Sequence, residues 1–163
     1  MDAIEALKTR RCVRQFLSDV PDRQVLENIL DCGRLAASAR NTQPWEFVVV
    51  TDPAVRSKLA SQIPNGPFIA DAPVCIVVVC QEGTYYLEDG CAATQNILNA
   101  VHACGLGACW VAGDKKPYVD FVLGLLGVPA GYKLVSLIPL GYTSACPSPS
   151  KRPLKDMVHW ENF

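Results

Sequence analysis

The chain has 163 residues and a formal net charge of −1, with 50% hydrophobic and 19% charged residues. This composition excludes a disordered chain, and the length is enough for one domain with a buried core, which we expect over residues 1–163. The near-neutral charge argues against nucleic acid or an anionic membrane as a partner, so any site for an anion has to be local.

The sequence contains no segment typical of export or membrane insertion. The N-terminus lacks a basic region followed by an apolar run, and the longest apolar runs, FVVV and VCIVVVC, are far shorter than the ~20 residues of a membrane-spanning helix. We therefore expect a cytoplasmic protein. The eight cysteines include no C-x-x-C pair, which argues against a zinc or iron–sulfur site. We expect them to be reduced and to act mainly as small core residues.

Hydrophobic periodicity and turn residues predict helices and strands that alternate along the chain. In the first half we expect, in chain order, a helix over Ala3–Lys8, an extended segment over Val13–Phe16, a helix from Pro21 to Ala37, a strand over Trp45–Thr51, a helix from Pro53 to Gln62 and a strand over Val74–Cys80. In the second half we expect a helix over Tyr85–Cys104, a strand over Ala108–Val111, a helix over Pro117–Leu126, a strand over Leu134–Tyr142 and an extended connection over Thr143–Pro153. The first two strands are rich in β-branched residues, which favours burial on both faces. The order predicts a sheet with helices on its faces, of the α/β or α+β class.

Three arginines lie within five residues in the run RRCVRQF, residues 10–16. In a strand, residues 10, 12 and 14 share a face, and in a helix residues 10 and 14 do, so Arg10 and Arg14 can converge on one object. Two close guanidinium groups repel each other, and a bound anion such as phosphate would relieve the repulsion through charge-assisted hydrogen bonds. The alternative is a solvated charge cluster at the end of a helix.

Two further stretches are candidates for a site. Asn41 and Gln43, in ARNTQPW, precede a predicted strand, and their amides can donate and accept at the edge of a heterocycle; the alternative is an ordinary turn. Arg152, in PSKRPL, is another cation on a proline-stiffened segment, and its alternative is a solvated tail charge. We leave His102 and His159, the two histidines, out of the site.

Together these stretches resemble the nitroreductase family of flavin mononucleotide (FMN) proteins. The resemblance is carried by R-R-x-x-R-x-F, N-x-Q-P-W-x-F-V-V-V, GLGACWV, LIPLGY and the final PSKRPL, and it extends from about Ile4 to about Val158. The chain is similar to the compact members of the family. The resemblance implies an α+β fold in three layers, with a central mixed β-sheet flanked by helices. It also implies a domain-shared homodimer with FMN sites at the subunit interface, where the helix Tyr85–Cys104 packs across the two-fold axis through its Gly90–Thr94 stretch.

The resemblance also implies roles for individual residues around non-covalent FMN. Arg10 corresponds to the ligand of the flavin phosphate, Arg11 to a neighbour that contributes mainly through its backbone, and Arg14 to the basic residue near the flavin N1/O2 edge. Arg152 corresponds to a C-terminal phosphate ligand. Cys12 replaces the usual serine of R-x-S-x-R. Because a thiol is a weak donor, we expect weaker phosphate binding; the alternative is an added redox-active group.

The remaining implied site residues come from three separate segments. Ala37, Ser38 and Ala39 correspond to residues contributed to the partner's cofactor, with Asn41 and Gln43 along the flavin. Trp110, Val111 and Ala112 correspond to the backbone segment near flavin N5, and Gly141 to the small residue of the P-L-G-Y run. Arg40 stands where a small polar residue is common. At the mouth of the site it would favour an anionic substrate or the phosphate of NADPH, whereas facing solvent it would have no role.

The implied function is an FMN-dependent oxidoreductase. Hydride passes from NAD(P)H to flavin N5 and then to an electron-poor small molecule, such as a nitroaromatic or quinone, by a ping-pong mechanism. Because the flavin carries this chemistry, no protein nucleophile is needed. One alternative is a flavin-binding or carrier protein without NAD(P)H turnover, and another is a cysteine-based metal or redox protein.

Overall fold

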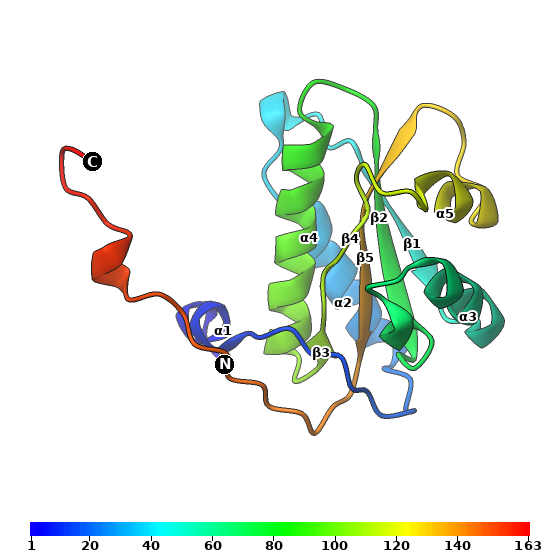
Figure 1. Cartoon of the computed structure of the whole chain (residues 1–163), viewed down its shortest axis with the longest axis horizontal. Helices are drawn as coiled ribbons and strands as arrows, with labels where there is room; N and C mark the ends of the chain where they lie inside the picture. Colours follow the sequence, from blue (N-terminus) through cyan, green and yellow to red (C-terminus); the bar gives the residue numbers. More distant parts are fainter.

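The structure, a computed structural model that describes residues 1–163, is an α+β fold built on a five-stranded sheet (Figure 1). Along the sheet lie β1 (Trp45–Val50), β2 (Val74–Gln81), β5 (Tyr132–Gly141) and β3 (Gly107–Ala108), and β4 (Val111–Ala112) also pairs with β5. All strand pairs are antiparallel, and the parallel component is the isolated bridge between Cys12 and Ala108. The predicted α+β class is confirmed.

Helices cover both faces of the sheet and produce three layers (Figure 1). The helices are α1 (Ala3–Thr9), α2 (Arg23–Arg34), α3 (Pro53–Gln62), α4 (Tyr86–Ala103) and α5 (Val119–Leu125), with short 3-10 turns η1 (Ala39–Asn41), η2 (Pro67–Ile69) and η3 (Leu154–Asp156). Helices α2 and α4 contribute to the core on one face, and α3, α5 and η2 to the core on the other. The helices lie where the sequence predicts them, with some ends moved by up to three residues: α2 ends at Arg34 instead of Ala37.

The two β-branched strands differ in burial. In β2, alternate residues such as Ile76 and Val77 belong to the two opposite cores, so the prediction of burial on both faces is confirmed there. In β1, Glu46 and Val49 are exposed, and the same prediction is wrong. The reason is position: β1 pairs with β2 alone and lies at the edge of the sheet, where the helices cover it incompletely.

The predicted strand Ala108–Val111 is divided into β3 and β4. Both strands face β5 in one continuous register, with Ala108 opposite Leu140 and Val111 opposite Leu137. Between them, the Cys109 amide donates to the Pro139 carbonyl at 3.2 Å. Proline has no amide hydrogen to donate in return, so the ladder is interrupted at this point.

The small residues of α4 face the sheet of their own chain. A Cβ atom added to Gly90 would lie 2.6 Å from Val135 Cγ2 and 2.8 Å from Cys80 Sγ. The Thr94 hydroxyl is 2.8 Å from Ser136 Oγ, and Ala93 is fully buried. Gly90, Ala93 and Thr94 therefore pack against β2 and β5 of the same chain. The contact of this helix across a two-fold axis stays a prediction, and it would have to use the other side of α4.

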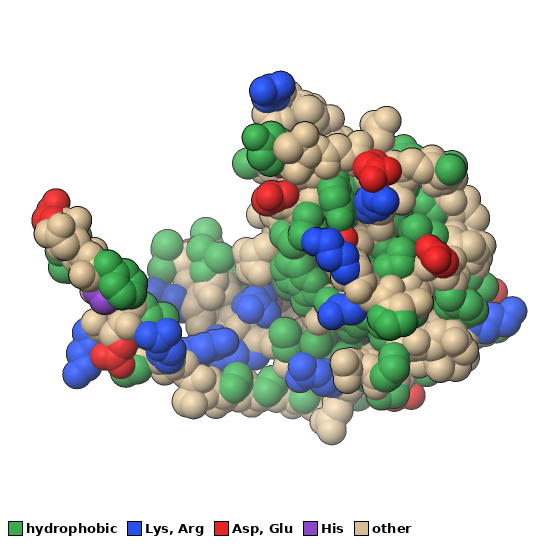
Figure 2. Space-filling view, turned by 45° about the horizontal axis from the view of Figure 1, so that its top comes forward, with side chains coloured by type: hydrophobic (Ala, Val, Ile, Leu, Met, Phe, Trp, Pro, Cys, Tyr) green, Lys and Arg blue, Asp and Glu red, His purple; other side chains and the backbone are tan.

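The C-terminal segment leaves the body of the molecule as an extended arm that passes α1 (Figure 1). Figure 2 shows the arm standing clear of the body, with hydrophobic and basic side chains along it. Leu154 is 74% exposed, Trp160 83% and Phe163 fully exposed. Thr143–Pro153 forms no helix or strand, in agreement with the predicted extended connection, and the residues that follow it leave a large apolar surface exposed. None of the helices combines the length and apolar character needed to cross a bilayer.

All eight cysteines are free thiols. Three are buried as expected, namely Cys75, Cys80 and Cys109. Three others, Cys32, Cys104 and Cys146, are exposed, so their interpretation as core residues is wrong. No group of three or more His, Cys, Asp or Glu side chains is arranged to hold a metal ion.

Candidate functional site

The arginine run is fixed in place at the edge of the sheet, next to β3. Cys12 forms its parallel bridge with Ala108 of β3, and the Val13 amide donates to the Ala108 carbonyl at 2.9 Å. Further along, the Leu17 amide donates to the Tyr142 carbonyl at 2.8 Å, just beyond β5. These bonds hold the run extended, which puts Arg10, Cys12 and Arg14 on one face, as the spacing predicts.

The positive charges of Arg10 and Arg14 both influence the Cys109 thiol. The Cys109 pKa is raised above the ordinary range of thiols, first by the hydrogen bond with Cys12 and then by burial, while the charges of Arg14 and Arg10 oppose the rise. Arg10 Nη1 lies 4.0 Å from Cys12 Sγ, and the Arg14 guanidinium lies 5.7 Å from the centre of the Phe68 ring.

Neither guanidinium is neutralised by a carboxylate. The four ion pairs of the structure involve other basic residues, namely Arg23, Arg34, Lys115 and Lys133. Two unpaired cations that share a face favour an anion site over a charge cluster satisfied within the chain.

The Arg11 side chain binds the backbone of residues that precede it. Its Nη1 donates to the Lys8 carbonyl at 2.9 Å and to the Arg10 carbonyl at 2.8 Å, while its buried Nε has no partner. The side chain thus anchors the end of α1, which is compatible with the predicted backbone role. The Nε2 atom of His102 lies 2.8 Å from Thr9 Oγ1 and connects α4 to α1. This histidine was left out of the predicted site.

The N-x-Q loop has an unusual backbone. Arg40, Asn41 and Gln43 have φ angles of 54°, 58° and 49°, in the left-handed region that residues other than glycine rarely adopt. Such strain concentrates at binding sites and persists where neighbouring contacts hold it. Here the Ser38 hydroxyl accepts from the Gln43 amide at 3.0 Å, and the buried Asp89 carboxylate of α4 accepts from the Ala39 amide at 2.8 Å.

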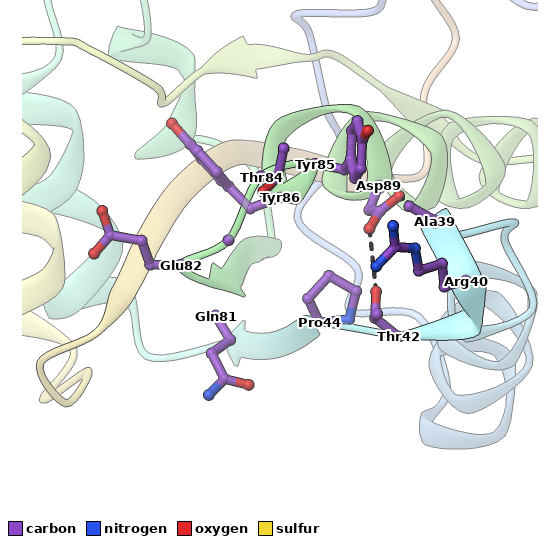
Figure 3. A pocket seen from close by; sticks show the side chains of 11 residues that line it. Ala39, Arg40, Thr42, Pro44, Gln81, Glu82, Thr84, Tyr85, Tyr86 and Asp89 are labelled. Carbon is purple, nitrogen blue, oxygen red and sulfur yellow. Dashed lines mark hydrogen bonds between the residues drawn. The ribbon is translucent and has the colours of Figure 1, made fainter.

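A pocket of about 460 Å³ lies between this loop and the start of α4 (Figure 3). Its lining includes Arg40, Thr42, Tyr85 and Asp89, and in Figure 3 the Arg40 side chain lies beside the Asp89 carboxylate at the edge of this pocket. Arg40 therefore lines a concave surface, although its side chain remains exposed.

The structure does not bring all the predicted site residues together within one chain. The arginine run passes the C-terminal end of α4, whereas η1 lies beside its N-terminal end (Figure 1). The 18 residues of α4 correspond to about 27 Å at ~1.5 Å per residue. Asn41 and Gln43 are thus separated from Arg10 and Arg14 by roughly this length.

The other predicted residues divide between the sheet and the arm. Val111 is buried and Ala112 exposed in β4, and Trp110 packs partly against the core beside Cys12. Gly141 is buried, and a Cβ there would meet Pro73 at 2.6 Å, so packing alone accounts for this glycine. The exposed Arg152 donates to the Asp156 carbonyl at 2.8 Å within the arm.

Sequence reasoning missed two residues of this region. Asp89 accepts a hydrogen bond from the N-x-Q loop. In the sequence, the one signal for this role was an acidic residue among the small residues of the predicted helix. Cys109 contacts Cys12, and its only signal was its place directly before Trp110 in GLGACWV.

The sheet, its two helical layers and the arginine run define a nitroreductase-type α+β protein. The sequence model of the nitroreductase family matches residues 7–65 and 61–142. This chain belongs to the nitroreductase family.

Individual relatives extend this similarity over the full chain. A protein of Methanothermobacter thermautotrophicus, provisionally named an NADH dehydrogenase/NAD(P)H nitroreductase, is 34% identical over 100% of this chain and 88% of its own length. The structure of an FMN-dependent nitroreductase from Clostridium difficile superposes with a TM-score of 0.88 at 28% identity, covering 98% of this chain and 99% of that one. A provisionally assigned nitroreductase of Desulfovibrio desulfuricans, solved in complex with FMN, gives 0.89 at 28% identity, covering 100% and 98%.

We expect Asp89→Ala to loosen the N-x-Q loop. The substitution removes a charged acceptor and leaves the Ala39 amide unpaired, which should cost about 1.5–3 kcal/mol of unfolding free energy. Chemical denaturation measures that loss, and hydrogen exchange should speed up at the Ala39 amide. The exposed neighbour Glu88 is the matched control, and Glu88→Ala should change stability by no more than ~0.5 kcal/mol. Equal effects of the two substitutions would contradict the role of Asp89.

Proposed function

We propose that this protein is an FMN-dependent NAD(P)H oxidoreductase that reduces electron-poor small molecules, such as nitroaromatics or quinones, by a ping-pong mechanism. The observation that carries the proposal is the pair of unpaired guanidiniums, Arg10 and Arg14, on one face of a run held against the sheet. Family membership and an FMN complex among the similar structures support it.

The residues present suit FMN. Arg10 would hold the phosphate, and Arg14 would place a positive charge near the flavin edge. The strained loop would present Asn41 and Gln43, and the segment from Trp110 to Ala112 would line the ring. FMN, when bound, supplies the hydride chemistry at N5 between NAD(P)H and the acceptor, so the chain has to bind, orient and stabilise charge, and no nucleophile is required of it.

We propose further that the complete site forms between two copies of the chain. The loop and the arginine run lie at opposite ends of α4, so a second subunit is needed to bring one next to the other. Exposed apolar side chains on α1 and on the arm, among them Ile4, Leu7, Trp160 and Phe163, provide surface for such a contact. Arg152 and the segment from Ala37 to Ala39 would then belong to the partner's cofactor site.

The test is the visible spectrum of the purified protein, followed by addition of NADH and NADPH without air. We expect oxidised flavin at about one per chain, bleached by a nicotinamide, in a protein that sediments as a dimer at micromolar concentration. Flavin that stays oxidised would indicate a carrier. A colourless protein that takes up no added FMN, or a monomer, would overturn the proposal.

A further inference from the structure

Two cysteines from distant parts of the sequence meet beside Arg10. We propose that Cys12 and Cys109 form a peroxide-sensitive thiol pair, in which Cys12 is oxidised first and Cys109 then closes a disulfide. This modification site does not require bound FMN, so it can hold or fail independently of the proposed function.

The contact is a consequence of the sheet. The bridge between Cys12 and Ala108 puts Cys12 next to the residue that precedes Cys109. Both side chains pack with the core on the α3 and α5 face of the sheet, whereas Ala108 belongs to the opposite core. Cys109 is 2% exposed and Cys12 is half-buried, so Cys12 is the thiol that a small oxidant reaches.

The surroundings shift the pKa values of the two thiols in opposite directions. The Cys109 thiol donates to the Trp110 carbonyl at 3.8 Å, and Arg10 Nη1 lies 4.0 Å from Cys12 Sγ. The Cys12 pKa is lowered to about 5, first by the adjacent Cys109 side chain, with smaller contributions from the Trp110 backbone and Arg10, against the opposing effect of burial. The Cys109 pKa is raised, first by its bond with Cys12. The directions of the two pKa shifts assign the thiolate of the pair to Cys12 and the proton to Cys109.

No other cysteine combines these features. Burial raises the pKa of both Cys75 and Cys80 to about 12, and no oxidant reaches them. Cys104 is exposed, but its pKa is raised by partial burial and by Cys32. Cys104 is therefore the natural internal control.

The proposed reaction needs a hydroperoxide as oxidant. The Cys12 thiolate attacks the peroxide, an S–O bond forms as the O–O bond breaks, and the leaving alkoxide or hydroxide takes a proton from water. Cys109 sulfur then attacks the Cys12 sulfenic acid; its proton leaves with the displaced hydroxide as water. The net change is two thiols and ROOH to one disulfide, ROH and water. A reducing thiol reverses it.

The first measurement is alkylation of the wild-type protein by iodoacetamide, with rates at each cysteine read by peptide mapping. Between pH 6.5 and 8.5 we expect the Cys12 rate to change by less than about twofold, because its thiolate population is already complete. The Cys104 rate should rise throughout this range. A Cys12 rate that follows the Cys104 rate would overturn the proposal, and this result does not depend on any variant folding.

The second measurement treats the protein with hydrogen peroxide, blocks free thiols and maps disulfides. We expect a Cys12–Cys109 link that dithiothreitol removes. In Cys109→Ser, Cys12 should stop at a sulfenic acid that dimedone traps, and in Cys12→Ser, Cys109 should stay reduced. Cys104→Ser is the matched control and should leave the link unchanged. Oxidation of Cys12 in the wild type with Cys109 still a free thiol would overturn the pairing.

Discussion

Arg10→Ala is expected to weaken FMN binding by about 1.5–3 kcal/mol, or roughly 10- to 150-fold in Kd, without unfolding the protein. The range is that of a charge-assisted hydrogen bond, and Arg10 makes no ion pair whose loss would add to it. Its guanidinium donates only to the Cys12 thiol, at 4.0 Å, so truncation leaves no buried carbonyl or carboxylate unsatisfied. Titration of the apoprotein with FMN, followed by flavin fluorescence, gives the Kd.

Two arginines serve as comparisons for this experiment. Arg23 on α2 pairs with Glu27 at the surface, with its side chain 91% exposed, and Arg23→Ala should leave the Kd unchanged. Arg14→Ala should act mainly on the midpoint potential of bound FMN and make it more negative, because a cation at the flavin edge favours the reduced form. An unchanged Kd for Arg10→Ala would show that the phosphate lies elsewhere.

The fold could be predicted from the sequence wherever the local pattern decides the structure. Continuous β-branched residues marked β2 as a buried strand, and helical periodicity together with proline and glycine signals located all five helices. The wrong predictions concern features that depend on the position of a strand in the sheet. The edge location of β1 exposes Glu46, and Pro139 interrupts the ladder of a strand that lies far from it in sequence. Neither effect is visible before the strand order is known.

The candidate site shows the same division between local and tertiary information. The alternating spacing predicted that Arg10 and Arg14 share a face, because an extended backbone alone determines it. The contact of Cys12 with Cys109 could not be predicted, since it depends on the bridge to β3. The left-handed backbone at Asn41 likewise depends on bonds within the loop and on Asp89, a residue of α4.

Gly90→Leu is expected to destabilise the fold of each subunit by about 3 kcal/mol or more, the upper part of the range for overpacking a core. The first added carbon would already lie 2.6 Å from Val135 and 2.8 Å from Cys80, and both belong to buried strands that cannot move apart cheaply. The gain in helix propensity over glycine, about 1 kcal/mol, is too small to offset this. Urea denaturation measures the difference.

The matched control is Ala92, two residues along α4 and half-exposed in the subunit. Ala92→Leu should keep the unfolding free energy within ~1 kcal/mol of wild type, because this position is partly exposed. The comparison separates two roles for the small residues of this helix. If Gly90 served a subunit contact, Gly90→Leu would weaken dimerisation in sedimentation and leave the subunit's denaturation midpoint unchanged. If Gly90→Leu lowers the stability of the subunit and Ala92→Leu does not, the glycine is needed for the close approach of α4 to β2 and β5.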